Sequence, residues 1–144
     1  MSSQFQLKAN QIPVVPDAFE LVDGRPHLVG TKCSKCGASF FPPRVICTNC
    51  LTDATVSRAV LGHTGTLYAF TVIHIAAKEF NPPYPFGYVI LEPEKIRVPT
   101  LITGVDDFGV LRTGMKMEMV IEKLREDSKG NEIITFKFRP AAEA

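Results

Sequence analysis

Residues 33–50 read CSKCGASFFPPRVICTNC, and this stretch decides how the middle of the chain folds. It contains all four cysteines of the protein, in two Cys-x-x-Cys pairs: Cys33 with Cys36, and Cys47 with Cys50. Two residues between paired cysteines allow a tight turn, or knuckle, to direct both sulfurs at one ion. Two knuckles complete a tetrahedral site. The spacing therefore predicts a zinc ribbon with one Zn²⁺ bound by four thiolates.

Four protein ligands leave zinc no open position, whereas catalytic zinc normally keeps one for water or substrate. The metal is therefore expected to be structural, and the folding of residues 30–56 is expected to depend on it. Gly37 suits the positive φ that a knuckle requires. Leu51 stands in the equivalent place after Cys50, so we expect the second knuckle to be less typical.

Two other uses of four cysteines are open to the sequence. Two disulfides would suit a secreted chain, but residues 1–6 lack the basic start and apolar run of a secretory signal. Iron on four thiolates is also open, because ligand type alone does not separate iron from zinc in such a site. An electron-transfer iron protein is accordingly one alternative function.

Composition sets broad limits on function. The 144 residues suit one ordinary domain or two small ones, and 45% apolar residues suffice for a core. Lysine and arginine number 16 against 15 acidic residues, which counts against sequence-independent nucleic-acid binding. The longest uncharged run, residues 59–77, is broken by glycine, histidine and threonine, and predicts a turn and strand rather than a membrane span. We expect a cytoplasmic protein.

The segments around the ribbon predict a mainly β protein. Before it, prolines at 13, 16 and 26 interrupt regular structure, and residues 17–22 predict a short helix capped by Asp17. After it, alternating apolar and polar residues predict five strands, which suit a small barrel of the oligonucleotide/oligosaccharide-binding (OB) type. The predicted strands are residues 64–75, 87–92, 98–103, 116–123 and 132–138. The predicted parts are an N-terminal extension (1–29), a rubredoxin-like zinc ribbon (30–56), a five-stranded OB-fold domain (57–140) and a tail (141–144).

This order of ribbon and barrel resembles a family of acyl-CoA-associated proteins, long known as a domain of unknown function. The resemblance covers about residues 28–140. Its motifs are CxxCG at 33–37, PPR at 42–44, CxxC at 47–50, GHTGTLYAFTV at 62–72, PYPFGYV at 83–89 and Gly114-Met115. The chain departs from the family in having no tryptophan and no proline in the second knuckle.

The resemblance implies a non-catalytic accessory subunit in a hetero-oligomer with a thiolase-superfamily enzyme. Such a subunit helps to bind or position acyl-CoA and stabilises the catalytic subunit. Members accompany archaeal acetoacetyl-CoA thiolase and hydroxymethylglutaryl-CoA synthase, enzymes of sterol side-chain degradation, and benzoylsuccinyl-CoA thiolase. The chain resembles the small subunit of the last at least as closely as the others. No membrane partner is implied.

Catalysis by this chain alone is not expected. With all four cysteines bound to metal, no thiol is left as the acyl-accepting nucleophile that a thiolase needs. The three histidines, His27, His63 and His74, show no catalytic spacing, and we expect each to have an ordinary structural role. Acyl transfer would then belong to a partner subunit.

Six residues are predicted to contact coenzyme A or the partner. The loop at 76–86 carries Phe80, Tyr84 and Phe86 among prolines, which gives contact area at low entropic cost. The competing interpretation is that Phe80 and Phe86 only close one end of the barrel. The phosphates of coenzyme A need cations, and the candidates are Lys35, Arg44 and Lys78. Arg44 could equally have a structural hydrogen-bonding role.

The main alternative function is a single-stranded nucleic-acid-binding module, since zinc ribbons and OB barrels both serve that role elsewhere. Such modules interleave basic residues with stacking aromatics. Here the predicted strands offer mainly Tyr68 and Phe70 as stacking aromatics.

Overall fold

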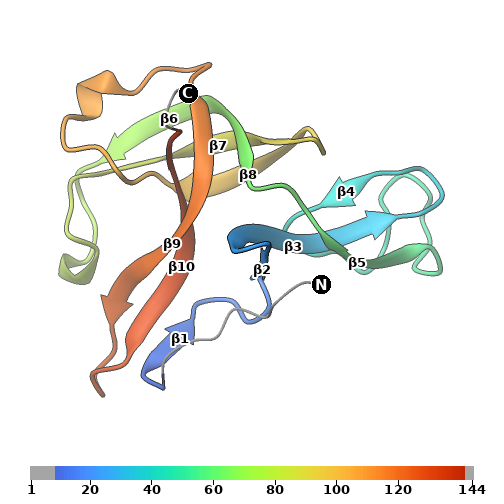
Figure 1. The fold of residues 1–144 in the computed structure, drawn as a ribbon, viewed down its shortest axis with the longest axis horizontal. Coiled ribbons are helices and arrows are strands. Elements are labelled where there is room, and N and C mark those ends of the chain that lie inside the picture. The colour runs from blue at the N-terminus through green and yellow to red at the C-terminus, as the bar shows by residue number, and fades with distance from the viewer. Residues whose placement is uncertain (1–8, 142–144) are drawn as a thin grey trace.

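The structure, a computed structural model, describes residues 9–141. In Figure 1 a small ribbon sheet lies beside a larger, strongly curved sheet. The strands are β1 (Gln11–Pro13), β2 (Phe19–Val22), β3 (Arg25–Cys33), β4 (Ser39–Phe40), β5 (Val56–Val60), β6 (Thr64–Ile73), β7 (Tyr84–Glu92), β8 (Ile96–Leu101), β9 (Lys116–Glu126) and β10 (Glu132–Pro140). Two short 3₁₀ helices complete the described elements: η1 (Lys78–Phe80) and η2 (Phe108–Val110). The mainly β prediction is confirmed.

The ribbon sheet is organised around β3. The first half of β3 pairs with β2, and its second half pairs with β4 and β5. Its last residue is Cys33, so the strand itself carries the first metal ligand into position. Gly30 permits this packing, because a Cβ there would clash with the carbonyl oxygen of Phe40 and lie 2.9 Å from Leu61 Cδ1.

The predicted helix at residues 17–22 is wrong. Residues 19–22 form β2, which pairs antiparallel with β3, and Asp17 adopts a left-handed φ of 59° before the strand rather than capping a helix. The turn between the strands is Asp23-Gly24, with φ of 52° and 80°. Two successive positive φ values match the tight hairpin turns that Asp-Gly favours. Six residues are too few for a stable isolated helix, so pairing with β3 decides the outcome.

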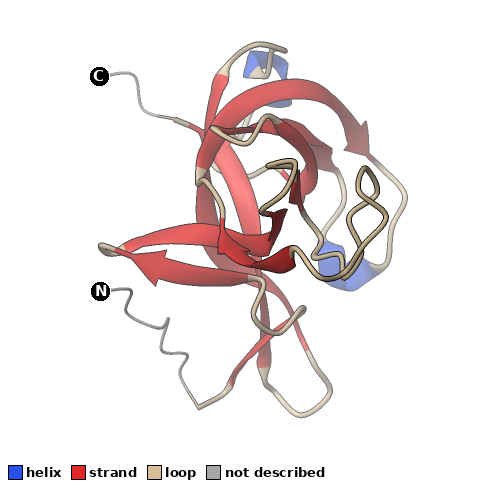
Figure 2. Cartoon of the chain, turned by 90° about the vertical axis from the view of Figure 1, so that its right-hand side faces the viewer, coloured by secondary structure: helices blue, strands red, loops and turns tan. Residues whose placement is uncertain are grey.

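The larger sheet has the strand order β1-β10-β9-β6-β7-β8. Its last five strands form an OB-type half-barrel, and Figure 2 shows how the sheet curls round on itself. The two ends meet where Ile102, just after β8, forms a parallel bridge with Phe138 of β10. The N–H of Thr103 donates to the carbonyl oxygen of Phe138 at 2.9 Å there. This parallel contact between the end of β8 and β10, the third and fifth barrel strands in chain order, therefore closes the five predicted strands into a barrel shape.

The N-terminal segment belongs to both sheets rather than standing apart. β1 pairs in parallel with β10, whereas β2 belongs to the ribbon sheet. The proposed division of the chain at residues 29/30 and 56/57 stays a prediction. Residues 1–8 of the expected extension and 142–144 of the expected tail lie outside the described residues.

A single hydrophobic core joins ribbon and barrel. Leu28 of β3 and Leu61 after β5 belong to the same buried cluster as the barrel residues Met117 and Phe138. Leu28, Met117 and Phe138 are fully buried. Because the two sheets share these contacts, the ribbon is held firmly on the barrel. Among residues 9–141, no helix has the length and apolar character needed to cross a membrane.

Candidate functional site

The four cysteine sulfurs lie together at the far end of the ribbon. All four Sγ atoms are within 4.8 Å of one another. The Cys33–Cys50 Sγ separation is 3.9 Å and the Cys36–Cys47 separation is 3.6 Å. A tetrahedral zinc with bonds of ~2.3 Å places its sulfurs ~3.8 Å apart. All four cysteines are free of disulfides. The donor set and its spacing therefore fit one zinc ion with no open position.

The two knuckles have the same backbone geometry. In the first, the N–H of Gly37 donates to the carbonyl oxygen of Cys33 at 2.9 Å, and in the second the N–H of Leu51 donates to Cys47 at 2.8 Å. Gly37 has a φ of 79° and Leu51 a φ of 56°. The second knuckle is therefore as regular as the first, although its leucine adopts a conformation that costs a side-chain residue ~1–2 kcal/mol.

The surroundings favour thiolates at some of these sulfurs and oppose them at another. The hydroxyl of Thr55, 3.2 Å from Cys33 Sγ, contributes most to lowering the pKa of Cys33 to about 6. The backbone N–H of Ala38 contributes most to lowering the pKa of Cys36. Burial raises the pKa of Cys50 to about 12. Cys50 is therefore deprotonated at neutral pH only with a cation beside it, which zinc would supply.

The predicted contact residues divide between two ends of the molecule. Lys35 is exposed in the first knuckle, and Arg44 lies between the knuckles. The backbone of Arg44 has a structural role, because its N–H donates a hydrogen bond to Thr31 Oγ1 at 2.9 Å. Its exposed side chain stacks over Phe40, with 5.8 Å from the guanidinium carbon to the ring centre. Lys78 lies in η1, at the opposite end of the long axis in Figure 1. The structure does not bring the ribbon cations and the loop together.

The aromatic residues of the predicted loop belong to two different elements. Phe80 ends η1 and, with Tyr84, Ile102 and Leu124, lines a cavity of about 50 Å³. It therefore does help to close one end of the barrel. Tyr84 and Phe86 are strand residues of β7, on its outer face.

Tyr88 falls inside the predicted strand 87–92 but was not among the predicted contact residues. In fact β7 starts at Tyr84, so Tyr84, Phe86 and Tyr88 alternate along one face of it. The Phe86 and Tyr88 ring centres are 6.2 Å apart. Tyr68 of β6 joins them, with the guanidinium carbon of Arg97 5.4 Å from its ring centre. We call Tyr68, Tyr84, Phe86 and Tyr88 the aromatic face; the alternation in YPFGY would have revealed three of the four.

A second surface was also missed. Val45, Ile46 and Leu51 surround the second knuckle and expose 76%, 56% and 81% of their surface. We call these three residues the apolar tip. The ribbon is too small to bury these side chains. The position of apolar residues next to knuckle cysteines could therefore have indicated that they lie on the surface. Contiguous exposed apolar side chains mark interaction sites.

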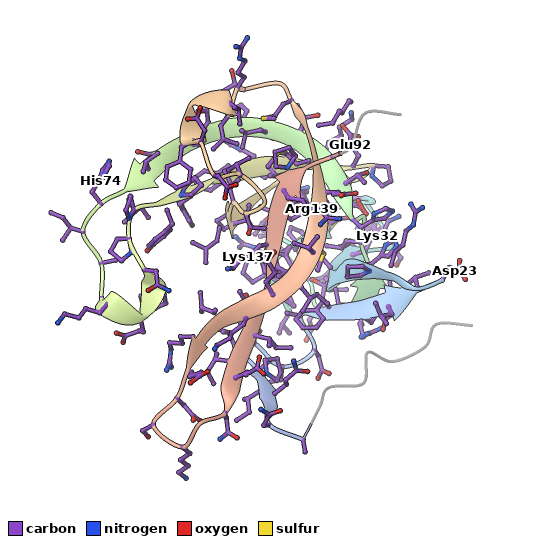
Figure 3. The ribbon with its side chains drawn as sticks, turned by 60° about the vertical axis from the view of Figure 1, so that its left-hand side comes forward. Asp23, Lys32, His74, Glu92, Lys137 and Arg139 are labelled. Carbon is purple, nitrogen blue, oxygen red and sulfur yellow. The ribbon has the colours of Figure 1, made fainter. Side chains whose placement is uncertain are left out.

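The histidines show no catalytic arrangement. His27 and His63 lie at the junction of ribbon and barrel, with ring centres 4.4 Å apart. His27 Nδ1 lies 2.8 Å from the carbonyl oxygen of Leu61, a hydrogen bond that ties β3 to the start of the barrel. Figure 3 shows His74 pointing outward, away from the ribbon, and it is exposed.

Two family models match the chain in sequence order. Residues 24–56 match the ChsH2 rubredoxin-like zinc ribbon domain, and residues 58–122 match the ChsH2 C-terminal OB-fold domain. The first match agrees with the sulfur geometry, and the expectation of one structural Zn²⁺ is confirmed.

Several characterised proteins are similar over most of their length. A DUF35 domain-containing scaffold protein of Methanocaldococcus jannaschii is 32% identical over 116 residues, covering 78% of this chain and 81% of that protein. The benzoylsuccinyl-CoA thiolase subunit BbsA of Thauera aromatica is 33% identical over 126 residues, covering 86% and 85%. BbsA of Geobacter metallireducens is 33% identical over 129 residues, covering 88% and 85%.

Among solved structures, the Ltp2-ChsH2(DUF35) aldolase contains a chain with the same fold. The TM-score is 0.65 at 25% identity, and the match covers 81% of this chain and 86% of that one. The sequence, the metal site and the strand order thus agree with the domain matches: this chain belongs to the ChsH2/DUF35 family of zinc-ribbon and OB-fold proteins.

Proposed function

We propose that this chain is a non-catalytic accessory subunit of a thiolase-type acyl-CoA enzyme, which it stabilises and helps to bind or position acyl-CoA. The observation that carries the proposal is the 33% identity, over more than four-fifths of both chains, with two proteins named as benzoylsuccinyl-CoA thiolase subunits. The aldolase complex with the same fold supports the broader role of an associated subunit.

The chemistry of the chain supports a role without catalysis. All its cysteines are ligands of a saturated structural metal site, so acyl transfer through a cysteine has to occur on the partner. What the chain does offer is exposed apolar and aromatic surface. Tyrosine is among the residues enriched at the energetic centres of protein interfaces, and exposed apolar patches mark interaction sites.

We assign partner docking to the apolar tip. Val45, Ile46 and Leu51 project from a backbone fixed by the metal, so little conformational entropy is lost when they are buried. At Leu51 a glycine would relieve the left-handed backbone, yet a leucine stands there with 81% of its surface exposed. Folding gains little from that side chain, whereas a partner pocket would gain its full burial.

We assign acyl-CoA contact to the end of the barrel around η1. Lys78 supplies a cation next to Phe80, and Tyr84 begins the aromatic face. In OB folds the face of the second and third strands and the loop between the first two strands form the ligand surface. β7, β8 and the η1 loop hold those positions here. Lys35 and Arg44, at the other end, would meet the partner or a second part of the ligand.

The experiment is to replace Phe80 and Tyr84 together by alanine. We expect weaker assembly with the catalytic subunit or weaker acyl-CoA binding by the assembled complex, measured by co-elution and calorimetry. Val110→Ala is the matched control, since Val110 is half-exposed on η2 away from this surface. A folded double variant with both affinities unchanged would refute the assignment of this end.

A single-stranded nucleic-acid module is the second candidate, because Tyr68 and Tyr88 lie on the strands with which OB folds bind oligonucleotides. Arg97 stacked on Tyr68 is the cation closest to that pattern. The near-neutral charge of the whole chain favours the first candidate. Salt-sensitive binding of single strands in a gel-shift assay would favour the second.

A further inference from the structure

A groove of about 480 Å³ lies where the hairpin β2–β3 meets β9 and β10. Its charged lining comes from three elements: Arg25 at the start of β3, Glu118 of β9 and Arg139 of β10. Figure 3 labels Arg139 on β10 and, at the tip of the hairpin β2–β3, Asp23. The groove is separate from the apolar tip and from the aromatic face. Its volume is in the range of small-molecule sites.

The charges in the groove do not cancel. Arg139 Nε donates to Glu118 Oε1 at 2.8 Å, so these two charges compensate each other. No ion pair joins Arg25 to another described residue. Arg25 is exposed at the rim and leaves one uncompensated positive charge beside the groove.

His63 adds an imidazole to the groove. Its ring lines the groove, and burial, followed by the charges of His27 and Arg25, lowers its pKa, while Glu118 acts weakly in the opposite direction. The imidazole is therefore neutral at pH 7 and free to form a hydrogen bond with a bound anion. Its environment is net positive, which disfavours its own protonation.

The rest of the lining is apolar. Leu21 and Pro26 of the hairpin face Ile121 of β9 across the groove, and each is only partly buried. A ligand that fills the groove would cover these side chains as well as meet the arginines. Apolar walls with a few convergent polar groups are typical of sites for small organic molecules.

We propose that this groove binds a carboxylate that carries an apolar group. The planar guanidinium of Arg25 matches a carboxylate in a two-point hydrogen-bonded pair. One uncompensated cation balances one carboxylate, whereas a phosphate dianion would meet the repulsion of Glu118 without a second free cation. The apolar group lies against Leu21, Pro26 and Ile121.

Such a carboxylate has two sources: a free organic acid, or an acidic side chain or chain end of a partner protein beside an apolar residue. The chemistry of recognition is the same in both. The proposal does not rest on the accessory-subunit function, because the groove belongs to this chain alone.

The test is an NMR titration of the zinc-loaded full chain with sodium benzoate, with benzyl alcohol and inorganic phosphate as comparison probes. We expect benzoate to shift the amide signals of Arg25, His63 and Ile121 saturably in the millimolar range, and to raise the pKa of His63. Benzyl alcohol and phosphate are expected to bind at least ~10-fold more weakly, which corresponds to ~1.4 kcal/mol. Equal binding of all three probes, or no saturable shift at these residues with benzoate, would overturn the proposal.

Two variants that change the charge of the groove in opposite directions test the proposal further. Arg25→Gln removes the uncompensated charge and should weaken benzoate binding by ~10-fold, the value of one charged hydrogen bond. Glu118→Gln removes the carboxylate that pairs with Arg139 and should strengthen benzoate binding. Arg25→Lys should retain part of the affinity. The control Arg112→Gln should retain all of it, because Arg112 is exposed in the loop after η2 and does not line the groove. An Arg25→Gln variant that folds and binds benzoate unchanged would refute the role of this residue.

The same probe distinguishes the two sources. If a partner carboxylate occupies the groove, benzoate should loosen the assembled complex and Arg25→Gln should weaken assembly. If the ligand is a free acid, benzoate should bind the assembled complex with the affinity measured for the chain alone.

Discussion

Leu51 is the residue whose replacement separates stability from binding. Its left-handed backbone costs a side-chain residue ~1–2 kcal/mol, which Leu51→Gly removes. Glycine adds ~0.5–1 kcal/mol of unfolded-state entropy, so the net stabilisation should be ~0.5–1 kcal/mol. Little burial is lost, because the side chain is 81% exposed. In a partner pocket the same side chain contributes ~1.5–3 kcal/mol, so Leu51→Gly should weaken assembly by ~10- to 100-fold.

Urea denaturation of the zinc-loaded chain measures the first effect, and titration of the catalytic subunit measures the second. Leu51→Ala is the informative companion, since it removes the side chain but keeps the strain: it should weaken assembly without stabilising the fold. Val110→Ala should change neither quantity. Destabilisation by Leu51→Gly would refute the backbone strain at this position. Glycine and alanine variants that both assemble as tightly as the native protein would refute its docking role.

Three further outcomes are expected. Complete zinc removal should raise amide hydrogen exchange in β4 and β5 before β7 and β9, because the ribbon loses the ion that holds its two knuckles together; equal exchange with and without metal would contradict this. Gly30→Ala should cost ~1–3 kcal/mol in urea denaturation, since its Cβ would clash with the carbonyl oxygen of Phe40; a stability equal to that of the native chain would count against the packing. The pKa of His63 is lowered in the folded chain, so near pH 6.5 the unfolded chain binds more protons than the folded one, and the free energy of unfolding should fall as the pH falls below 6.5. His63→Gln should flatten this pH dependence. An unchanged slope would mean that another group causes the dependence.

The cysteine spacing predicted the ribbon well because its information is local. Both knuckles and the shape of the metal site follow from residues 33–50 alone. The five barrel strands were found for a similar reason, since turns and alternation mark each of them. Their ends were less predictable. The second barrel strand was predicted to start at residue 87, whereas β7 starts at Tyr84. Pro85 is tolerated in β7 because β8 ends at Leu101 opposite Phe86, so this proline lies beyond the stretch paired on both sides.

The elements that were missed depend on partners distant in sequence. β1 exists because residues 11–13 pair with β10, more than a hundred residues later. Residues 17–22 were mistaken for a helix because so short a segment shows no clear alternation, whereas the Asp23-Gly24 turn sets the pairing of β2 with β3. Short strands take their stability from pairing, which local sequence does not display.

The candidate site was predicted in its parts but not in its arrangement. The loop residues were recognised as surface, yet a sequence cannot show that Lys35 and Arg44 lie at the other end of the molecule from Lys78. The apolar tip and the groove between the β2–β3 hairpin and β9–β10 likewise arise from folding, which leaves Leu51 outside the core and places Arg25 and Arg139 in the lining of one groove.

The proposed role as a subunit of an acyl-CoA enzyme can be tested without any variant. The chain is affinity-purified from its native host at native expression level, the mass of the intact assembly is determined and the companion chain is identified. We expect a stable hetero-oligomer that contains a thiolase-type catalytic subunit. Recovery of the chain only as a lone monomer, with no such companion, would contradict it.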